Sequence, residues 1–367
     1  MIYLTHAQAA YSEQTELLDG LYSQRVHWFP DTYARVKTGM SYPPHKLTEK
    51  VIVPELAEWL RATPMKTAFI LAGGNQHFAG INKMAKSPLV YEYKFLPLTL
   101  TQVYAGRIAQ QLGANDLIQT DATACVSSLK ACMDVQTLIK FYGFDRVIVL
   151  GVEDAVSASV LDFFGESGAS LTKAKEDASG MVPSAFDDKN QGFYVGQGAV
   201  LAVFHSQKAI NRLKMAPLAR LHSAYTASED CSNAIGQRND GQGYINAMKG
   251  AMDLADLSRK DIRVVKTHGT GTASNNAAER AALEATLEGF IATSFKPKIG
   301  HTMGASGLLE SVMLCESISR GVIPAIPNRT QNDSVFLSQD AKAPSGLFLS
   351  LAAGMGNVYS AAIFEVM

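Results

Sequence analysis

The chain has 367 residues, of which 47% are hydrophobic and 18% are charged, so it can bury a large core and is not expected to be disordered. Its 33 basic and 34 acidic side chains give a formal net charge of −1. Without a basic cluster, this balance argues against a dedicated nucleic-acid binder. No apolar run reaches the ~18 residues of a membrane span, and residues 1–20 lack the basic and apolar regions of a signal peptide. We therefore expect a cytoplasmic protein without a membrane or nucleic-acid partner.

Four cysteines are too few for a disulfide framework in a chain of this length. Only Cys125 and Cys132 lie near one another, and their spacing is not that of a CxxC metal knuckle. We expect free thiols in a reducing compartment.

Apolar runs alternate with helical patterns along the chain, which predicts an α/β fold with buried strands. The expected strands are Ile2–Leu4, Thr67–Leu71, Leu117–Thr120, Arg146–Leu150, Ala199–Phe204, Arg263–Lys266 and Ala361–Phe364. The expected helices are Glu13–Leu21, Pro54–Arg61, Leu100–Leu112, Val126–Tyr142, Tyr244–Ala255, Asn276–Leu287 and Leu308–Ser319. The segment Glu166–Gln191 is rich in Gly, Ser and Asp and predicts a long loop. A boundary near Phe204–Arg212 predicts two closely packed halves, residues 1–205 and 206–367.

Cys125 lies where an expected strand passes into a long helix. The N–H groups and the dipole of a helix N-terminus favour a thiolate, so this position predicts a lowered pKa. The small neighbours Ala124 and Ser127 leave room for a substrate. A buried cysteine that only fills the core is the alternative, and the local sequence leaves both interpretations open.

His268 and His301 each follow a short expected strand and precede small residues and a helix. Such strand ends are where α/β proteins place their sites. One cysteine and two histidines could also hold zinc or form a Cys–His hydrolase site, but their separations match no compact zinc motif. We expect no metal site. The segments Gly73-Gly74 and Gly269-Thr270-Gly271 match neither common nucleotide-binding motif.

Six motifs, in order along nearly the whole chain, carry a resemblance to a known family. They are DATACVSS, GVEDA, SAFDDKNQGFYVGQGAVLAVF, KTHGTGT, KPKIGHTMGASGLLES and LAAGMGNVYSAAIF. Together they resemble the β-ketoacyl-acyl carrier protein synthases, the elongating condensing enzymes of fatty acid and polyketide synthesis. The resemblance implies decarboxylative Claisen condensation of an acyl-enzyme thioester with malonyl-acyl carrier protein.

The same resemblance implies a thiolase-like α/β fold, with two similar halves in a five-layer αβαβα arrangement. It implies a homodimer, or a heterodimer with another ketosynthase-like subunit. The implied partner is an acyl carrier protein, which supplies its phosphopantetheine arm, and no tightly bound cofactor is expected.

The resemblance also assigns roles to individual residues. Cys125 is the implied acyl-accepting nucleophile, and the other implied catalytic residues are His268, His301, Lys296 and Glu310. The implied substrate-binding residues are Thr270, Thr272, Gly354, Met355 and Gly356. The backbone N–H groups of Cys125 and Met355 are the implied oxyanion hole.

The sequence departs from the family pattern at several positions, among them Val358-Tyr359 in place of the usual Thr-Asn, and its region between Trp28 and Lys66 is shorter than expected. Amides replace the usual charged residues at Asn190, Gln191, Gln197 and Asn276, and Met355 replaces a gating aromatic residue. A flexible methionine can admit unusual acyl chains, so we expect a specialised polyketide or polyene synthase rather than a housekeeping enzyme.

Two alternatives remain open. One is a non-catalytic subunit similar to a chain-length factor, although the retained Cys125 argues against it. The other is a non-decarboxylative thiolase, which is disfavoured because Cys315 lies within an expected helix and no cysteine follows His301 at its loop.

Overall fold

The computed structural model describes residues 1–18, 21–28, 32–36, 44–73, 100–156, 158–171, 173–231, 233 and 236–367. Gly74, part of one rejected nucleotide-binding motif, lies outside these residues. Within them, every helix is too short or too polar to cross a lipid bilayer.

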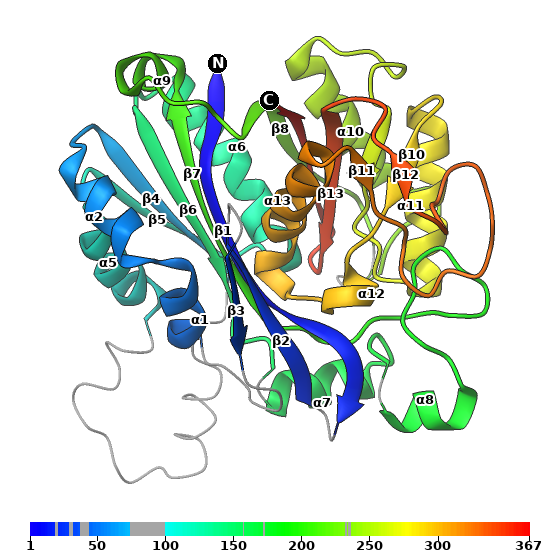
Figure 1. The fold of residues 1–367 in the computed structure, drawn as a ribbon. Helices are drawn as coiled ribbons and strands as arrows, with labels where there is room; N and C mark the ends of the chain where they lie inside the picture. The colour runs from blue at the N-terminus through cyan, green and yellow to red at the C-terminus, as the bar shows by residue number, and fades with distance from the viewer. Residues whose placement is uncertain are drawn as a thin grey trace, which may run out of the picture.

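In the described residues, a mixed sheet of twelve strands forms the framework (Figure 1). Its main path runs β10-β9-β13-β14-β8-β1-β7-β6-β4-β5, and β2 and β3 extend it from β1. The strands of the first half are β1 (Ile2–Leu18), β2 (Leu21–Trp28), β3 (Thr32–Val36), β4 (Thr67–Ala72), β5 (Leu117–Asp121), β6 (Arg146–Val152) and β7 (Gly198–Ser206). Those of the second half are β8 (Ala219–Ser228), β9 (Val264–Lys266), β10 (Ile291–Thr293), β13 (Leu347–Gly354) and β14 (Val358–Val366). A separate pair is formed by β11 (Val322–Ile323) and β12 (Ala341–Lys342).

The strand order repeats. Along the sheet, β5-β4-β6-β7-β1 and β10-β9-β13-β14-β8 each place five successive main strands in the order third, second, fourth, fifth, first. The two sets join where Ile2–Leu4 of β1 pairs with Ala219–Leu221 of β8. The repeated strand order shows that the sheet is built from two sets of strands with the same arrangement. It supports the predicted division into residues 1–205 and 206–367, whose exact bounds stay a prediction.

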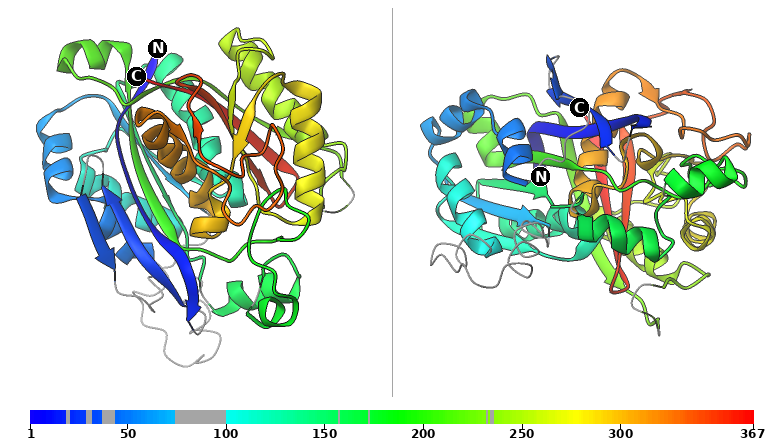
Figure 2. Two further views of the ribbon diagram at one scale, coloured as in Figure 1. Left: turned by 45° about the vertical axis from the view of Figure 1, so that its right-hand side comes forward. Right: turned by 90° about the horizontal axis from the view of Figure 1, so that it is seen from below.

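Helices form three layers around the two half-sheets. Their bounds are α1 (Pro44–Val51), α2 (Pro54–Ala62), α5 (Thr101–Leu112), α6 (Ser127–Lys140), α7 (Ala158–Glu166), α8 (Lys173–Ser179), α9 (Gln207–Leu213), α10 (Gln242–Ala255), α11 (Ala273–Thr286), α12 (Lys296–Ile299) and α13 (Ser306–Ser319). The helices α6 and α13 contact strands of both halves and one another, so they form the central layer. Figure 2 shows α13, in orange-brown, between the blue and green strands and the red ones. Outside, α5 covers β4 and β5, and α10 covers β8 and β14. The predicted five-layer arrangement is confirmed.

Two of the expected elements are wrong. Residues 13–18 of the expected helix Glu13–Leu21 belong to β1, and Leu21 begins β2. Pairing of this part of β1 with β2, where Glu13 lies opposite Ser23 and Leu18 opposite Leu21, outweighs the local helical pattern. The expected loop Glu166–Gln191 contains α8, whose Ala, Lys and Glu residues favour a helix. All seven expected strands and the other six expected helices are present, with ends displaced by a few residues, except that the expected strand Ile2–Leu4 continues to Leu18 as β1.

The turn after His268 requires glycine, which gives a test of the fold at the site. Gly271 and Gly289 have φ of +72° and +62°. A Cβ on Gly271 would lie 1.9 Å from the Ser184 carbonyl oxygen, whereas a Cβ on Gly289 would meet no described atom within 4 Å. We expect Gly289→Ala to lower the free energy of unfolding by about 1 kcal/mol, and Gly271→Ala by about 3 kcal/mol or more. Denaturant unfolding measures both, and equal losses would contradict the close packing of this turn.

Candidate active site

Cys125 lies in a single turn of 3-10 helix, Ala124–Val126, between β5 and α6. Ala124 has φ +49°, a left-handed conformation that is uncommon for a residue other than glycine. Asp121 stabilises the turn, because its Oδ1 accepts hydrogen bonds from the Thr123 N–H and hydroxyl at 3.2 and 2.6 Å. The predicted junction is thus confirmed, and Cys125 is 7% exposed.

The second half contains the same turn. Met303–Ala305 forms a 3-10 turn before α13, and Met303 has φ +50°. Gly304 therefore occupies the place that Cys125 has in the first half. Its N–H donates to Glu153 Oε2 at 2.6 Å, and the two turns pack against each other. Because His301 lies just before the second turn, this packing brings it beside Cys125.

His268 and His301 face the same space from two different elements. His268 follows β9, as predicted. The short strand predicted before His301 is wrong, because Lys296–Ile299 forms the helical turn α12, with a proline at its start. The two ring centroids are 5.5 Å apart, and the rings are nearly perpendicular. His301 Nδ1 accepts the Met303 N–H at 3.3 Å, so in the neutral ring the proton lies on Nε2. Among the described residues, His301 Nε2 and His268 Nδ1 are buried without a hydrogen-bond partner. Buried polar atoms usually have a hydrogen-bond partner, so these two ring nitrogens are available to bind a ligand.

Both imidazoles are neutral near pH 7. Burial holds the pKa of His268 well below its usual value, and the positive charges of Lys296 and Lys266 lower it further. Burial and the same two lysines lower the pKa of His301. A neutral ring is a hydrogen-bond donor through one nitrogen only, so these rings can each offer one N–H to a developing negative charge.

The predicted lowering of the Cys125 pKa is wrong. Burial raises the pKa of the thiol to about 12, and the nearby carboxylate of Glu153 adds to the increase, while Lys296 opposes it. The cost of removing a thiolate from water outweighs the favourable position at the start of α6. In the resting site the cysteine is therefore a neutral thiol.

Lys296 and Glu310 meet behind the histidines, as the resemblance implies. Lys296 Nζ donates to Glu310 Oε1 at 2.7 Å, and the Ser306 hydroxyl donates to the same oxygen. Lys266 is a third member of this group, which was not predicted from the sequence. Its Nζ donates to Glu310 Oε2 at 3.1 Å and to the Leu351 carbonyl at 2.7 Å. The one sign of its role in the sequence is that a lysine is unusual in an apolar strand such as the one before His268. Burial would raise the pKa of Glu310, but the two lysines hold it below its usual value.

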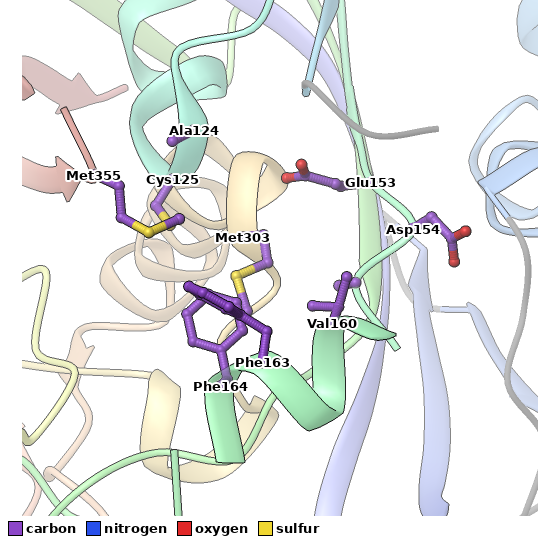
Figure 3. Close-up of a pocket in the computed structure, with 10 residues that line it drawn as sticks. Ala124, Cys125, Glu153, Asp154, Val160, Phe163, Phe164, Met303 and Met355 are labelled. Carbon is purple, nitrogen blue, oxygen red and sulfur yellow. The ribbon is translucent and has the colours of Figure 1, made fainter. Parts of the chain in front are cut away.

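Two cavities of about 340 Å³ each meet at Cys125. The first is mainly apolar and is lined by Val160, Phe163, Phe164, Met303 and Met355, among others. Figure 3 shows Cys125, Met303 and Met355 gathered above the rings of Phe163 and Phe164, with Asp154 turned away. The second is more polar and contains His268, His301, Thr270 and Thr272. Cys125 and Met355 line both cavities, so a molecule in one can reach the other past the sulfur.

Most of the predicted site residues thus converge. Those that line the polar cavity are Cys125, His268, His301, Thr270, Thr272, Gly354 and Met355. Lys296 and Glu310 lie behind this wall, and Gly356 lines neither cavity. Phe193, missed from the sequence, packs edge-on against His301 with ring centroids 5.2 Å apart. Across the described ranges, no group of three His, Cys, Asp or Glu residues is placed to hold a metal ion.

Comparisons with known proteins agree with this geometry. The chain is 26% identical over 299 residues to the mitochondrial 3-oxoacyl-[acyl-carrier-protein] synthase of Arabidopsis thaliana, covering 76% of this chain and 63% of that protein. It is 28% identical over 284 residues to the tetracenomycin polyketide synthase ketoacyl synthase alpha subunit of Streptomyces glaucescens, covering 75% and 65%. The matches therefore span less than two thirds of the length of these relatives.

Solved structures share the fold. A β-ketoacyl synthase from Burkholderia phymatum aligns with a TM-score of 0.77 at 17% identity, over 100% of this chain and 99% of that one. The ishigamide ketosynthase/chain length factor aligns with a TM-score of 0.76 at 17% identity and the same coverage. The predicted thiolase-like α/β fold is confirmed. The family model for the β-ketoacyl synthase N-terminal domain matches residues 57–209, and that for the C-terminal domain matches residues 218–330. Because these two models together match well over half of the chain, it belongs to the β-ketoacyl synthase family.

Proposed function

We propose that the chain is a decarboxylating condensing enzyme that joins an acyl group on Cys125 to a malonyl group carried by an acyl carrier protein. The product is a 3-oxoacyl-acyl carrier protein. The observation that carries this proposal is the junction at Cys125, where an apolar cavity meets a polar one that contains two imidazoles, each with one ring nitrogen that lacks a hydrogen-bond partner among the described residues. A nucleophile between a polar entrance and an apolar pocket suits a substrate with a polar arm and an acyl chain.

The two cavities suggest how such a substrate binds. Thr270 and Thr272 line the polar cavity, where their hydroxyls can hydrogen-bond the phosphopantetheine arm of the carrier protein. The acyl chain then occupies the apolar cavity beside Phe164 and Met303. The carrier protein brings the phosphopantetheine with it, so this chemistry needs no cofactor resident in the chain.

In the first step the Cys125 sulfur attacks the carbonyl carbon of the acyl thioester. The carbon–sulfur bond to the pantetheine arm breaks, and the proton of the Cys125 thiol passes to the departing sulfur. The backbone N–H groups of Cys125 and Met355 stabilise the oxyanion, each by roughly 2.7–4 kcal/mol when such donors are well oriented. The raised pKa of Cys125 implies that proton removal and attack are coupled.

In the second step the malonyl group loses CO₂, and the electron pair of the broken bond forms an enolate. Neutral His268 and His301 donate N–H groups to its oxygen. The enolate carbon attacks the acyl-Cys125 carbonyl, a carbon–carbon bond forms, and the thiolate leaves and regains a proton from water. Because the pKa values of both histidines are low, each ring enters this step neutral, with one N–H to donate.

The assembly proposed for this enzyme is a dimer, with itself or with a related subunit. In the described part of the chain, β5 ends the main path of the sheet and pairs only with β4. An edge strand of this kind offers unpaired backbone groups to a second subunit. The substitutions at Asn190, Gln191, Gln197 and Met355 support a specialised polyketide or polyene pathway over housekeeping fatty acid synthesis.

A second candidate is a non-catalytic subunit similar to a chain-length factor. The same amide substitutions and Met355 motivate it. The retained Cys125 and its position between both cavities favour the catalytic proposal. A wild-type protein that never accepts an acyl group, alone or with a partner subunit, would instead support the second candidate.

The histidines should be required for decarboxylation. We expect His268→Ala and His301→Ala each to lower CO₂ release from malonyl-acyl carrier protein by at least about 100-fold, since each removes an enolate donor. Acyl transfer to Cys125 should survive at least partly. His222→Ala is the matched control, because His222 pairs with Glu365 on another strand and should leave the rate unchanged. Wild-type rates in both site variants would show that the pair has another role.

The thiol of Cys125 should react slowly and increasingly with pH. With a pKa of about 12, its alkylation by iodoacetamide should rise about tenfold per pH unit from pH 7 to 9, because only the thiolate reacts. Cys231→Ser removes the partly exposed thiol, and fully buried Cys132 should stay unmodified. A cerulenin-like epoxide should also label Cys125. A rate that levels off near pH 8, or label on Cys132 or Cys315 alone, contradicts the assignment.

Met355 should set the tolerance for long acyl chains. It is 41% exposed and lines both cavities, so its flexible side chain can move aside. We expect Met355→Phe to shift the accepted chains of acyl-carrier protein towards shorter ones, with loading of acetyl groups intact. Met355→Leu, similar in volume, should keep the wild-type profile. The chain lengths loaded onto Cys125 are measured by mass spectrometry. If Met355→Phe accepts the same chain lengths as the wild type, Met355 does not control access to the apolar cavity.

A further inference from the structure

Lys266 is a buried cation that the proposed mechanism has not used. It ends β9, two residues before His268, and is 0% exposed. Its Nζ shares the carboxylate of Glu310 with Lys296. Two ammonium groups therefore meet one carboxylate in a region without water access, and the cluster carries a net positive charge when both lysines are protonated.

A buried charge without a full partner is costly, and an apolar side chain would fill the same space more cheaply. Core packing therefore does not account for a second lysine. The contacts of Lys266 indicate what it serves. It donates to the Leu351 carbonyl at 2.7 Å, so one ammonium joins the strand before His268 to β13, which leads to Gly354 and Met355.

We propose that Lys266 is a positioning residue, whose ammonium gives the Glu310 cluster a net positive charge that acts on the His268 and His301 rings and stabilises the negative charge developing beside them. The inference rests on the proposed condensing function and names a residue beyond it. Lys266 acts through the histidines and does not itself touch substrate.

The charged surroundings of Lys266 come from four elements. Glu310 lies on α13, Lys296 on α12 and Glu279 on α11, while His268 follows β9 itself. Burial is the main cause that lowers the pKa of Lys266, Glu310 and Glu279 oppose it and Lys296 assists it, and the resulting pKa is about 8. The cluster is therefore positive below about pH 8 and neutral above it. Decarboxylation in the wild type should fall as the pH rises through about 8.

Lys266→Met tests the inference, because methionine is similar in length and uncharged. Lys298→Met is the control, since Lys298 is an exposed lysine of the same helix as Lys296. At pH 7 we expect Lys266→Met to release CO₂ from malonyl-acyl carrier protein about tenfold more slowly than the wild type. Its rate should not show the decrease that the wild-type rate shows above pH 8. Its histidine rings, followed by ¹⁵N NMR, should become protonated at higher pH than in the wild type, because a repelling charge is gone. Lys298→Met should match the wild type in all three measurements.

The NMR measurement separates this inference from the proposed function. If the wild type releases no CO₂, the condensing function fails, whereas the ring titration still tests the effect of Lys266. Unchanged ring protonation and an unchanged pH profile in Lys266→Met would overturn the inference. If Lys266→Met does not fold, the wild type decides: its His268 and His301 ring signals should shift with a midpoint near pH 8, and their constancy between pH 7 and 9.5 would overturn it.

Discussion

The buried carboxylate of Glu310 holds the site together. Through Lys266 it fixes the end of β9, where His268 follows, and through Lys296 it fixes α12, which leads to His301. Glu310 itself lies on α13, directly after the turn that faces Cys125. Lys266 extends the same connection to β13 through Leu351. Removal of this one carboxylate would leave two buried ammonium groups uncompensated, which is far more costly than loss of a surface ion pair.

The electrostatics of the site follow from its dryness. Burial opposes every charged form, so the thiol of Cys125 and both imidazoles are neutral at rest. The positive cluster behind the histidines therefore faces two neutral rings, and a substrate brings the negative charge that it stabilises. Such a site stabilises a transition state in which negative charge develops between fixed donors. It stabilises a neutral ground state much less, and this difference is what accelerates the reaction.

The sequence predicted the site better than it predicted the path of the chain. Cys125 and His268 could be found because each follows a strand and precedes small residues, a local pattern. His301 follows α12 instead, so only the small residues after it were a valid signal. The role of Lys266 could not be found, because its meaning depends on Glu310, which lies 44 residues away in the chain. The strand at residues 13–18 was missed because its sequence has a helical pattern, which pairing with the next strand of the chain, β2, overrides in the fold. The high pKa of Cys125 was missed because burial is a property of the folded site, whereas a helix start is visible in the sequence.

The central claim is that Cys125 carries the acyl group which the histidine pair then helps to extend. Intact mass spectrometry tests it most directly. The protein is incubated with an acyl-acyl carrier protein, and malonyl-acyl carrier protein is then added. We predict a gain of one acyl group that maps to Cys125, followed by its loss together with formation of a 3-oxoacyl-acyl carrier protein. A protein whose mass never changes, or one acylated at Cys125 that keeps the group when malonyl-acyl carrier protein is present, would contradict the account.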